Sequence, residues 1–470
     1  MKMLIAGKWV NRKDTIDVRD PWDDSLVDRI PCANNADVDA VLAGAVEGAA
    51  IAKAMPSHER RSILLKAAAL MEKRAGALAR TIAREGSKTI VEARKEVGRA
   101  INTMTLSAEE AIRINGETLP FDSFPGSENR TGYFYRFPIG VILAITPFND
   151  PLNLVAHKVG PAVAGGNSVI VKPATVTPLS AINLVKCLVD AGLDPKVVSV
   201  ITGHGSVIGD PLVRDERVRM VSFTGGVDAG KLVAANAGIK KIGMELGSNC
   251  PTIVFDDCDF NAAVESCLSG SFWACGQNCI GVQRLYVQKG IFEKFKKKFV
   301  QLAKRYKVGP KLDEDCTMGP LINETEAIRV KEWIDEAVDH GAKLLCGGKR
   351  KGSVVTPAVL EGVKAKSRLA WDEVFGPAVC LFPFTNTYEA IRKANNVNYG
   401  LLAGVFTKDV NRALKVSEEL DCGGVIINDS SDYRLDAMPF GGVKYSGLGR
   451  EGIRFALQEM TEPKVVCFTR

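Results

Sequence analysis

Short apolar runs alternate with amphipathic segments through most of the chain. Runs such as "GVILAITPF" (140–148) are typical of strands buried on both faces. In "TPLSAINLVKCLVDAGL" (177–193) the apolar residues recur every three or four positions, which predicts a helix. The first series of strands is expected at 140–148, 168–174, 197–203, 219–226 and 251–255. Strand and helix in alternation predict a parallel sheet with right-handed crossovers.

A second series of strands and helices follows further along the chain. Its helix pattern is clearest at 324–342, and its apolar runs lie at 283–288, 378–384, 401–407 and 423–429. We therefore expect a second α/β domain. A mainly helical leader (37–115) precedes both series, and "TGYFYRFP" (131–138) is expected to form an extended arm outside the main sheets.

Composition narrows the class of protein. With 470 residues, 46% hydrophobic and 25% charged, the chain is expected to be a soluble globular protein of more than one domain. No apolar run reaches the roughly 18 residues of a membrane helix, and the N-terminus does not match a secretory signal. The net charge of +6 is modest, and the lysine clusters have acidic neighbours. These features predict a cytoplasmic protein without nucleic-acid or membrane partners.

Twelve cysteines without a secretion signal indicate reduced thiols rather than a disulfide framework. Cys275 and Cys279 lie four positions apart in "SFWACGQNCIGVQRLYV" (271–287). No second Cys or His pair is nearby and the four histidines are scattered, so no metal site is expected. Each of the two cysteines remains either a small packed residue or a nucleophile.

Several polar residues follow the ends of predicted strands. Asn149 comes after the strand at 140–148, and Lys172 ends the next one. "FTGG" (223–226) closes a later strand and opens a helix, which suits a bound phosphate or a plain tight turn. Parallel sheets bind ligands at the carboxyl ends of their strands, so these positions are candidates for a ligand site. The G-x-G-x-x-G spacing of a dinucleotide fingerprint is absent from "TGHGSVIG".

Four further motifs occur in one order: "GMELGSN" (243–249), "GQNC" (276–279), "DEVFGP" (372–377) and the segment 428–452. With them the chain resembles the aldehyde dehydrogenase superfamily nearly end to end. The resemblance implies an aldehyde dehydrogenase-like α/β fold, with two parallel-sheet α/β domains plus a small bridging β arm. The implied parts are a cofactor-binding domain (1–118 and 138–247), a catalytic domain (248–432), and an arm (119–137 and 455–470) that joins a homodimer or homotetramer.

The resemblance also implies catalytic roles. Cys279 matches the nucleophile, whose thiohemiacetal with an aldehyde becomes a thioester that water hydrolyses. Glu245 matches the base that activates this water, and Asn149 matches the amide that stabilises the oxyanion. Cys275 is then a packed residue one helical turn earlier, or a partner of Cys279 in a reversible disulfide under oxidation.

For the cofactor, the resemblance implies NAD or NADP. Thr175 stands where many NAD-preferring members have a glutamate that repels a 2′-phosphate, so NADP is permitted. Ser248 and Gly226 replace a glycine and a serine that are usual in the family, and neither change touches the chemistry directly. The matching cofactor positions are Lys172, Thr175, Thr224, Gly225, Gly226, Glu373 and Phe375.

The substrate implied is a short-chain, anionic or hydroxylated aldehyde. The chain resembles a subgroup that includes lactaldehyde, phosphonoacetaldehyde and succinic semialdehyde dehydrogenases, and the candidate cations are Arg99, His157 and Arg434. Arg99 lies opposite the apolar stripe of its helix, so a solvated arginine is the alternative. Arg434 has Asp432 or Asp436 as alternative partners, and His157 can be a packed histidine. A CoA-acylating dehydrogenase and a non-catalytic binding protein remain the alternative functions.

Overall fold

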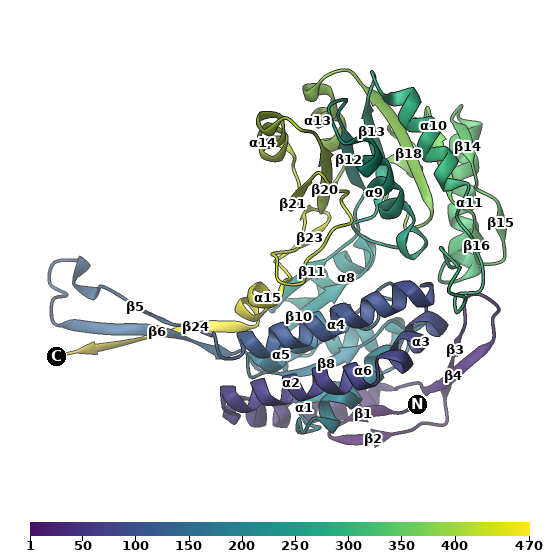
Figure 1. Ribbon diagram of the computed structural model, residues 1–470. Helices are drawn as coiled ribbons and strands as arrows, with labels where there is room; N and C mark the ends of the chain where they lie inside the picture. Colours follow the sequence, from purple (N-terminus) through teal and green to yellow (C-terminus); the bar gives the residue numbers. More distant parts are fainter.

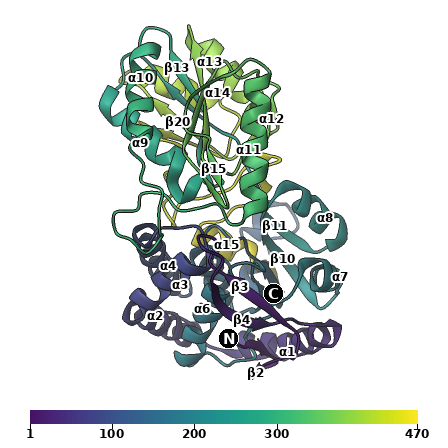
Figure 2. The same cartoon turned by 90° about the vertical axis from the view of Figure 1, so that its right-hand side faces the viewer.

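The computed structural model describes residues 1–470 and contains two large β-sheets, each covered by helices, in two lobes (Figures 1 and 2). One sheet has eight strands in the order β2-β1-β9-β8-β7-β10-β11-β23. Its central strands are parallel, while β1, β2 and β23 pair antiparallel at its edges. The bounds are β1 Met3–Ile5, β2 Lys8–Val10, β7 Val141–Ile145, β8 Ser168–Lys172, β9 Val198–Val200, β10 Val218–Thr224, β11 Lys241–Glu245 and β23 Gly447–Leu448.

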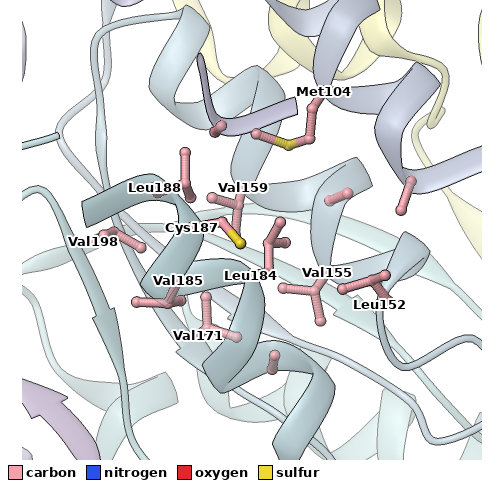
Figure 3. Packing of buried hydrophobic residues seen from close by; sticks show 14 of the residues in the cluster. Met104, Leu152, Val155, Val159, Val171, Leu184, Val185, Cys187, Leu188 and Val198 are labelled. Carbon is pink, nitrogen blue, oxygen red and sulfur yellow. The ribbon is translucent and has the colours of Figure 1, made fainter. Parts of the chain in front are cut away.

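This eight-stranded sheet is buried on both faces, as its continuous apolar runs predict. In β7, Val141 and Leu143 pack on one side while Ile142 and Ala144 pack on the other. Helices α1, α7 and α8 cover the first side, and α2 to α6 cover the second, where α5, α6 and β8 share a core (Figure 3). Their bounds are α1 Asn35–Ala54, α2 Ser57–Lys73, α3 Ala75–Glu85, α4 Ile90–Glu110, α5 Asn153–Ala164, α6 Leu179–Asp190, α7 Asp210–Arg214 and α8 Val227–Ala237.

The second sheet has seven strands in the order β14-β17-β18-β13-β12-β20-β21. Helices α9 to α12 pack on one face, and α13 and α14 pack on the other. The strand bounds are β12 Cys250–Val254, β13 Val282–Gln288, β14 Lys343–Cys346, β17 Ala358–Glu361, β18 Ala378–Phe384, β20 Leu402–Phe406 and β21 Gly424–Ile427. The helix bounds are α9 Phe260–Phe272, α10 Phe292–Ala303, α11 Glu324–Asp339, α12 Arg368–Trp371, α13 Thr387–Asn395 and α14 Val410–Glu419.

The pattern of apolar runs lists one strand with the wrong series. It puts 251–255 with the first series, unlike the domain bound at 248 that the resemblance implies, and β12 lies in the seven-stranded sheet between β13 and β20. The last parallel strand of the eight-stranded sheet is β11, which the pattern missed. In β11 the apolar residues Ile242 and Met244 flank a glycine and follow two lysines, so no apolar run marks it.

The extended arm expected at 131–138 is confirmed. Strand β6 (Arg130–Pro138) leaves the body of the molecule and pairs along its whole length with β24 (Thr461–Thr469). With β5 (Glu117–Thr118) they form a three-stranded antiparallel sheet that projects from the two lobes (Figure 1). Three short two-stranded antiparallel sheets complete the fold. Two are hairpins: β3 Thr15–Arg19 with β4 Leu26–Pro31, and β15 Arg350–Lys351 with β16 Val354–Val355. The third pairs β19 Tyr399–Gly400 with the distant β22 Val443–Lys444.

The C-terminal segment joins the two lobes. After β21 the chain leaves the seven-stranded sheet and returns to the eight-stranded one as β23, which pairs with β11. Helix α15 (Ile453–Glu459) then packs on α4 and α5 before the chain enters β24. None of the helices combines the length and apolar character needed to cross a bilayer.

Candidate active site

A strained turn leads into Cys279. Ala274, Cys275 and Gly276 have φ angles of +49°, +59° and +69°, a left-handed conformation that is unfavourable for the two residues with side chains. Glu92 of α4 accepts a hydrogen bond of 2.8 Å from the Ala274 amide. The Gln277 side chain donates to the Ala274 carbonyl at 3.1 Å. These contacts fix the path of the chain before the nucleophile candidate.

Cys279 faces a cavity of about 460 Å³ between the two lobes. The cavity wall comes from α4, the loop after β7, the segment from α9 to Ile280, and the segment 429–440. The predicted residues that line it are Cys279, Asn149, Arg99 and Arg434. The structure thus brings four predicted residues, distant in sequence, to one site.

The two cysteines of the opening motif have different surroundings. Cys275 is fully buried in the core of the seven-stranded sheet and does not line the cavity. Cys279 is partly exposed on the cavity wall. Burial raises the pKa of the Cys279 thiol, and the positive charge of Arg434 opposes this only in part. The free thiol therefore keeps its proton until a base or a bound ligand changes its environment.

Asn149 lies in the loop that follows β7 and lines the same cavity. Its side-chain amide makes no hydrogen bond within the protein. A free amide beside Cys279 has the chemistry of an oxyanion donor.

Glu245 ends β11 behind the cavity rather than on its wall. It is buried, and its Oε2 has no hydrogen-bond partner. Burial raises the pKa of this carboxyl well above its usual range, and the nearby charge of Glu451 raises it further. Glu245 lines a void of about 20 Å³, which is enough space for one water molecule.

Glu451 and Lys158, which the motifs did not single out, form a buried ion pair beside Glu245. Lys158 Nζ donates to Glu451 Oε1 at 2.9 Å and to Ser222 Oγ at 3.1 Å. Arg434 Nη2 donates to Glu451 Oε2 at 2.9 Å. Burial opposes ionisation of Glu451, but Lys158 and then Arg434 outweigh it and hold its pKa well below the usual range. Arg434 is therefore paired with Glu451, and not with Asp432 or Asp436.

Arg99 is not on a solvated face. It lines the cavity, and its guanidinium lies 2.9 Å from Asp436 and 3.6 Å from Asp150. The apolar stripe of α4 marks only the side toward its own core, while the opposite side faces the segment 429–440. The alternative of an unpaired arginine on a solvated helix face does not hold, because Arg99 is ion-paired on the cavity wall.

The geometry does not favour direct substrate contact by His157. Its side chain is fully buried, does not line the cavity, and has Nε2 3.0 Å from Asp436 Oδ1. Burial lowers the pKa of His157, so the neutral ring donates this hydrogen bond. His157 reaches the cavity only through other residues: Asp436 also binds Arg99, and the Arg434 guanidinium lies 3.5 Å from His157 Nε2.

The residues predicted for the adenosine side of a cofactor lie at strand ends of the eight-stranded sheet. Lys172 ends β8, and its ammonium contacts only the Pro173 carbonyl, at 3.2 Å. Burial lowers the pKa of Lys172 to about 8. Thr175 donates to the Gly203 carbonyl at 3.3 Å. No carboxylate pairs with this buried lysine.

The turn between β10 and α8 also has free donors. The Thr224 hydroxyl is buried without a partner, and the Gly225 amide donates to the Glu245 carbonyl at 3.1 Å. Gly226 is the N-cap of α8 and has open space where a side chain would stand. The first turn of α8 therefore presents uncapped N–H groups, which suit an anion.

Glu373 and Phe375 lie near Cys279. Glu373 accepts a hydrogen bond of 2.7 Å from the Ser248 amide, and burial raises its pKa to about 7. Phe375 has a φ of +42° and places its ring 5.7 Å from Phe148, edge to face. The pair offers an aromatic wall, and Glu373 retains a carboxylate oxygen without a hydrogen-bond donor.

Comparisons agree with the motifs. The sequence model of the aldehyde dehydrogenase family matches residues 9–466. An aspartate-semialdehyde dehydrogenase 1 of Pseudomonas canavaninivorans is 50% identical over 452 residues, 96% of each chain. A 3-sulfolactaldehyde dehydrogenase of Priestia aryabhattai is 42% identical over 464 residues, 99% of this chain and 97% of that one.

Two solved structures have the same fold over the whole chain. Aldehyde dehydrogenase 21 of Physcomitrella patens, in complex with its product succinate, has a TM-score of 0.97 at 38% identity and covers 100% and 98% of the two chains. The glyceraldehyde-3-phosphate dehydrogenase of Methanocaldococcus jannaschii, complexed with NADP, has a TM-score of 0.94 at 40% identity and covers 98% and 100%.

Proposed function

This chain belongs to the aldehyde dehydrogenase family, and from that premise we propose that it oxidises a short anionic aldehyde to the carboxylic acid with NAD or NADP. The observation that carries the proposal is the single cavity walled by Cys279, Asn149, Arg99 and Arg434. Its volume of about 460 Å³ is at the lower end of ligand pockets, which span roughly 300–1,000 Å³. A nucleophile, an oxyanion donor and two cations therefore surround the space that the substrate would fill.

The named relatives support an anionic substrate. Aspartate semialdehyde, 3-sulfolactaldehyde and glyceraldehyde 3-phosphate each carry an anionic group, as does the succinate bound in one neighbour. These groups differ in shape and charge, and what they share is the need for cations near the nucleophile. Arg99 and Arg434 supply two cations on the wall of this chain's cavity.

The cofactor fits the donors that the structure leaves without partners. Lys172 has no carboxylate partner, the Thr224 hydroxyl is orphaned, and the first turn of α8 is uncapped. Together they suit the ribose and pyrophosphate of a dinucleotide. Glu373 has a free carboxylate oxygen for the hydroxyls of the second ribose.

In the reaction we propose, Cys279 releases its thiol proton to a base or to water, its Sγ bonds to the aldehyde carbon, and the carbonyl oxygen becomes an oxyanion. The Asn149 amide and the Cys279 backbone N–H stabilise this oxyanion. A bound nicotinamide would supply the hydride acceptor that turns the Cys279 thiohemiacetal into a thioester. Water then breaks the thioester and releases the carboxylic acid together with the thiol.

Glu245 is suited to activate this water. Its pKa is raised by burial, so its carboxylate is a stronger base than an exposed one, and its Oε2 is free. The rival acceptor of the acyl group is CoA, in a CoA-acylating dehydrogenase. A retained buried base favours hydrolysis, which needs one, over transfer to a thiol.

A substrate panel tests the proposed function. The formation of reduced nicotinamide is measured with anionic, hydroxylated and uncharged short aldehydes, with NAD and with NADP, each with and without CoA. We expect anionic aldehydes to have the highest kcat/KM and CoA to make no difference. A strict requirement for CoA would contradict the hydrolytic role, and the absence of turnover with any aldehyde would favour a binding protein.

Replacing Arg99 should remove the preference for anions. We expect Arg99→Ala to lower kcat/KM for anionic aldehydes about 100-fold, or about 2.7 kcal/mol, and to change that for an uncharged aldehyde much less. Arg94→Ala is the matched control, because Arg94 is on the same helix but pairs with Glu314 at the surface. An equal loss for charged and uncharged aldehydes would make Arg99 structural.

Replacing Thr175 should change the KM for NADP relative to that for NAD. We expect Thr175→Glu to raise the KM for NADP at least about tenfold while NAD is affected far less, since a carboxylate here would face the 2′-phosphate. Thr175→Gln has the same shape without the charge and serves as the control. Initial rates with both nucleotides give the result. If the two variants behave alike, the site of the 2′-phosphate is elsewhere.

We also propose that the domains predicted from the sequence have separate roles. The eight-stranded sheet carries at its strand ends the residues assigned to the adenosine side of the cofactor, and Cys279 lies between β12 and β13 of the seven-stranded sheet. The projecting arm exposes the side chains of Tyr133, Val465 and Phe468. Apolar side chains on a projecting sheet favour a role in self-association.

A further inference from the structure

Two carboxylates line the same cavity as the arginines. Asp429 and Asp432 belong to the wall formed by 429–440, and neither has a salt-bridge partner within 4.0 Å. Arg99 and Arg434, in contrast, are each paired with a carboxylate behind the wall. Asp429 and Asp432 are therefore the carboxylates of this wall that have no ion-pair partner in the protein.

Asp432 is the carboxylate connected to the nucleophile segment. Its Oδ1 accepts a hydrogen bond of 2.5 Å from the side-chain amide of Asn278, the residue before Cys279. Its Oδ2 makes no hydrogen bond within the protein. One oxygen thus fixes the side chain while the other stays free on the cavity wall.

The surroundings of Asp432 leave its negative charge poorly stabilised. Burial raises the pKa of Asp432 to about 7, and Asp429 and Glu92 add repulsion that Arg99 only partly offsets. The two lysines of the cavity wall do not pair with Asp432. Lys88 binds Glu96 and Asp150, and Lys95 lies over the Trp273 ring at 5.0 Å. A cationic group placed in the cavity would compensate this charge.

Asp429 has the same charge and lies on the same wall, but it is not connected to the nucleophile segment. Its Oδ1 accepts hydrogen bonds from the Ser266 hydroxyl and from the Ser430 amide, and its Oδ2 has no partner. Asp429 therefore differs from Asp432 in the position of its carboxylate and not in having a free oxygen. Replacing Asp429 is therefore the control for an effect of negative charge that does not require contact with the substrate.

We propose that Asp432 binds an ammonium group of the substrate, so that the preferred substrate is a short aldehyde carrying both a carboxylate and an ammonium, as in the semialdehyde of an acidic amino acid. This inference rests on the proposed function, in which Arg99 and Arg434 bind the carboxylate. The cavity then offers a partner to each charged group on the α-carbon, with cations for the carboxylate and a free carboxylate oxygen for the ammonium.

Three four-carbon substrates test the inference, because they differ only in one substituent. Aspartate semialdehyde has an ammonium, malate semialdehyde a hydroxyl, and succinic semialdehyde a hydrogen. Assays at about pH 8 keep Asp432 ionised, since its pKa is about 7. We expect the kcat/KM of the wild-type enzyme for aspartate semialdehyde to exceed that for succinic semialdehyde at least about tenfold, or 1.4 kcal/mol.

Variants then assign the preference to one residue. Asp432→Asn should bring the ratio of these two kcat/KM values close to one, whereas Asp429→Asn should retain the wild-type ratio. Equal loss of the ratio in both variants would overturn the role of Asp432. Equal kcat/KM for succinic and aspartate semialdehydes in the wild type would overturn the inference without any variant, as would malate semialdehyde matching aspartate semialdehyde.

The proposed function fails in a different way. If an uncharged four-carbon aldehyde has a kcat/KM equal to that of succinic semialdehyde, the arginines do not select an anion, and the proposed function falls together with the inference. If succinic semialdehyde is preferred over the uncharged aldehyde but not exceeded by aspartate semialdehyde, only the inference falls.

Discussion

Cys279→Ala is expected to lower kcat at least about 10⁴-fold for every aldehyde that the protein oxidises. Without Sγ no thiohemiacetal forms, and no other cysteine lines the cavity. The measurement is reduced nicotinamide formed per protein molecule, in both the first turnover and the steady state. Both should be lost, because the nucleophile acts before the hydride leaves.

Cys275→Ala is the matched control. Cys275 packs in the core of the seven-stranded sheet, away from the cavity, so this change should cost stability of about 1 kcal/mol and leave kcat within a few fold of the wild type. Denaturant unfolding and steady-state kinetics measure the two effects. Inactivation by Cys275→Ala with retained activity in Cys279→Ala would reverse the assignment of the nucleophile.

Glu245→Gln is expected to lower steady-state kcat about 10²- to 10⁴-fold while the first turnover persists. Glutamine keeps the shape of the side chain but cannot take a proton from water, so the thioester accumulates. Rapid mixing should show a burst of reduced nicotinamide close to one per active site, followed by slow turnover. Loss of the burst as well would mean that Glu245 acts on the Cys279 thiol instead.

The pH dependence of the wild type follows from the same carboxyl. A general base works only when ionised, and burial raises the pKa of Glu245 well above its ordinary value of 4.5. As pH falls through this raised pKa the base is protonated, so kcat should begin to fall at a higher pH than an exposed glutamate would give. Glu245→Gln should abolish this limb of the profile.

Strands that the fold buries on both faces were predictable from the sequence. In β7, and at Val169–Val171 of β8, each position packs against one helix layer or the other, so the apolar run itself marks the strand. The apolar run of β12 did not predict which of the two sheets the strand belongs to. Its partner β20 lies about 150 residues further along the chain, and an apolar run carries no information about which strands it will pair with.

Site residues that belong to recognisable motifs were predictable from the sequence. Site residues that are defined by buried ion pairs in the fold were not. Cys279, Asn149 and Glu245 were found by motif, whereas Glu451 was not, because its partners Lys158 and Arg434 lie in other segments. One feature of the sequence does point to a buried ion pair at Lys158. Lys158 stands in "LNLVAHKVGPAVA", a helix that is buried on every side, and a lysine there needs an acid partner from elsewhere in the fold.

The path of the C-terminal segment has a consequence for synthesis of the protein. Strand β23, Glu451, α15 and β24 all lie within residues 447–470, which the ribosome makes after the rest of the eight-stranded lobe. Until they emerge, the nascent chain holds Lys158 in an apolar helix without its acid partner, and β11 lacks the neighbour that covers its edge. The eight-stranded lobe therefore cannot complete its fold before residues 447–470 have been made, and the active site should form only after that.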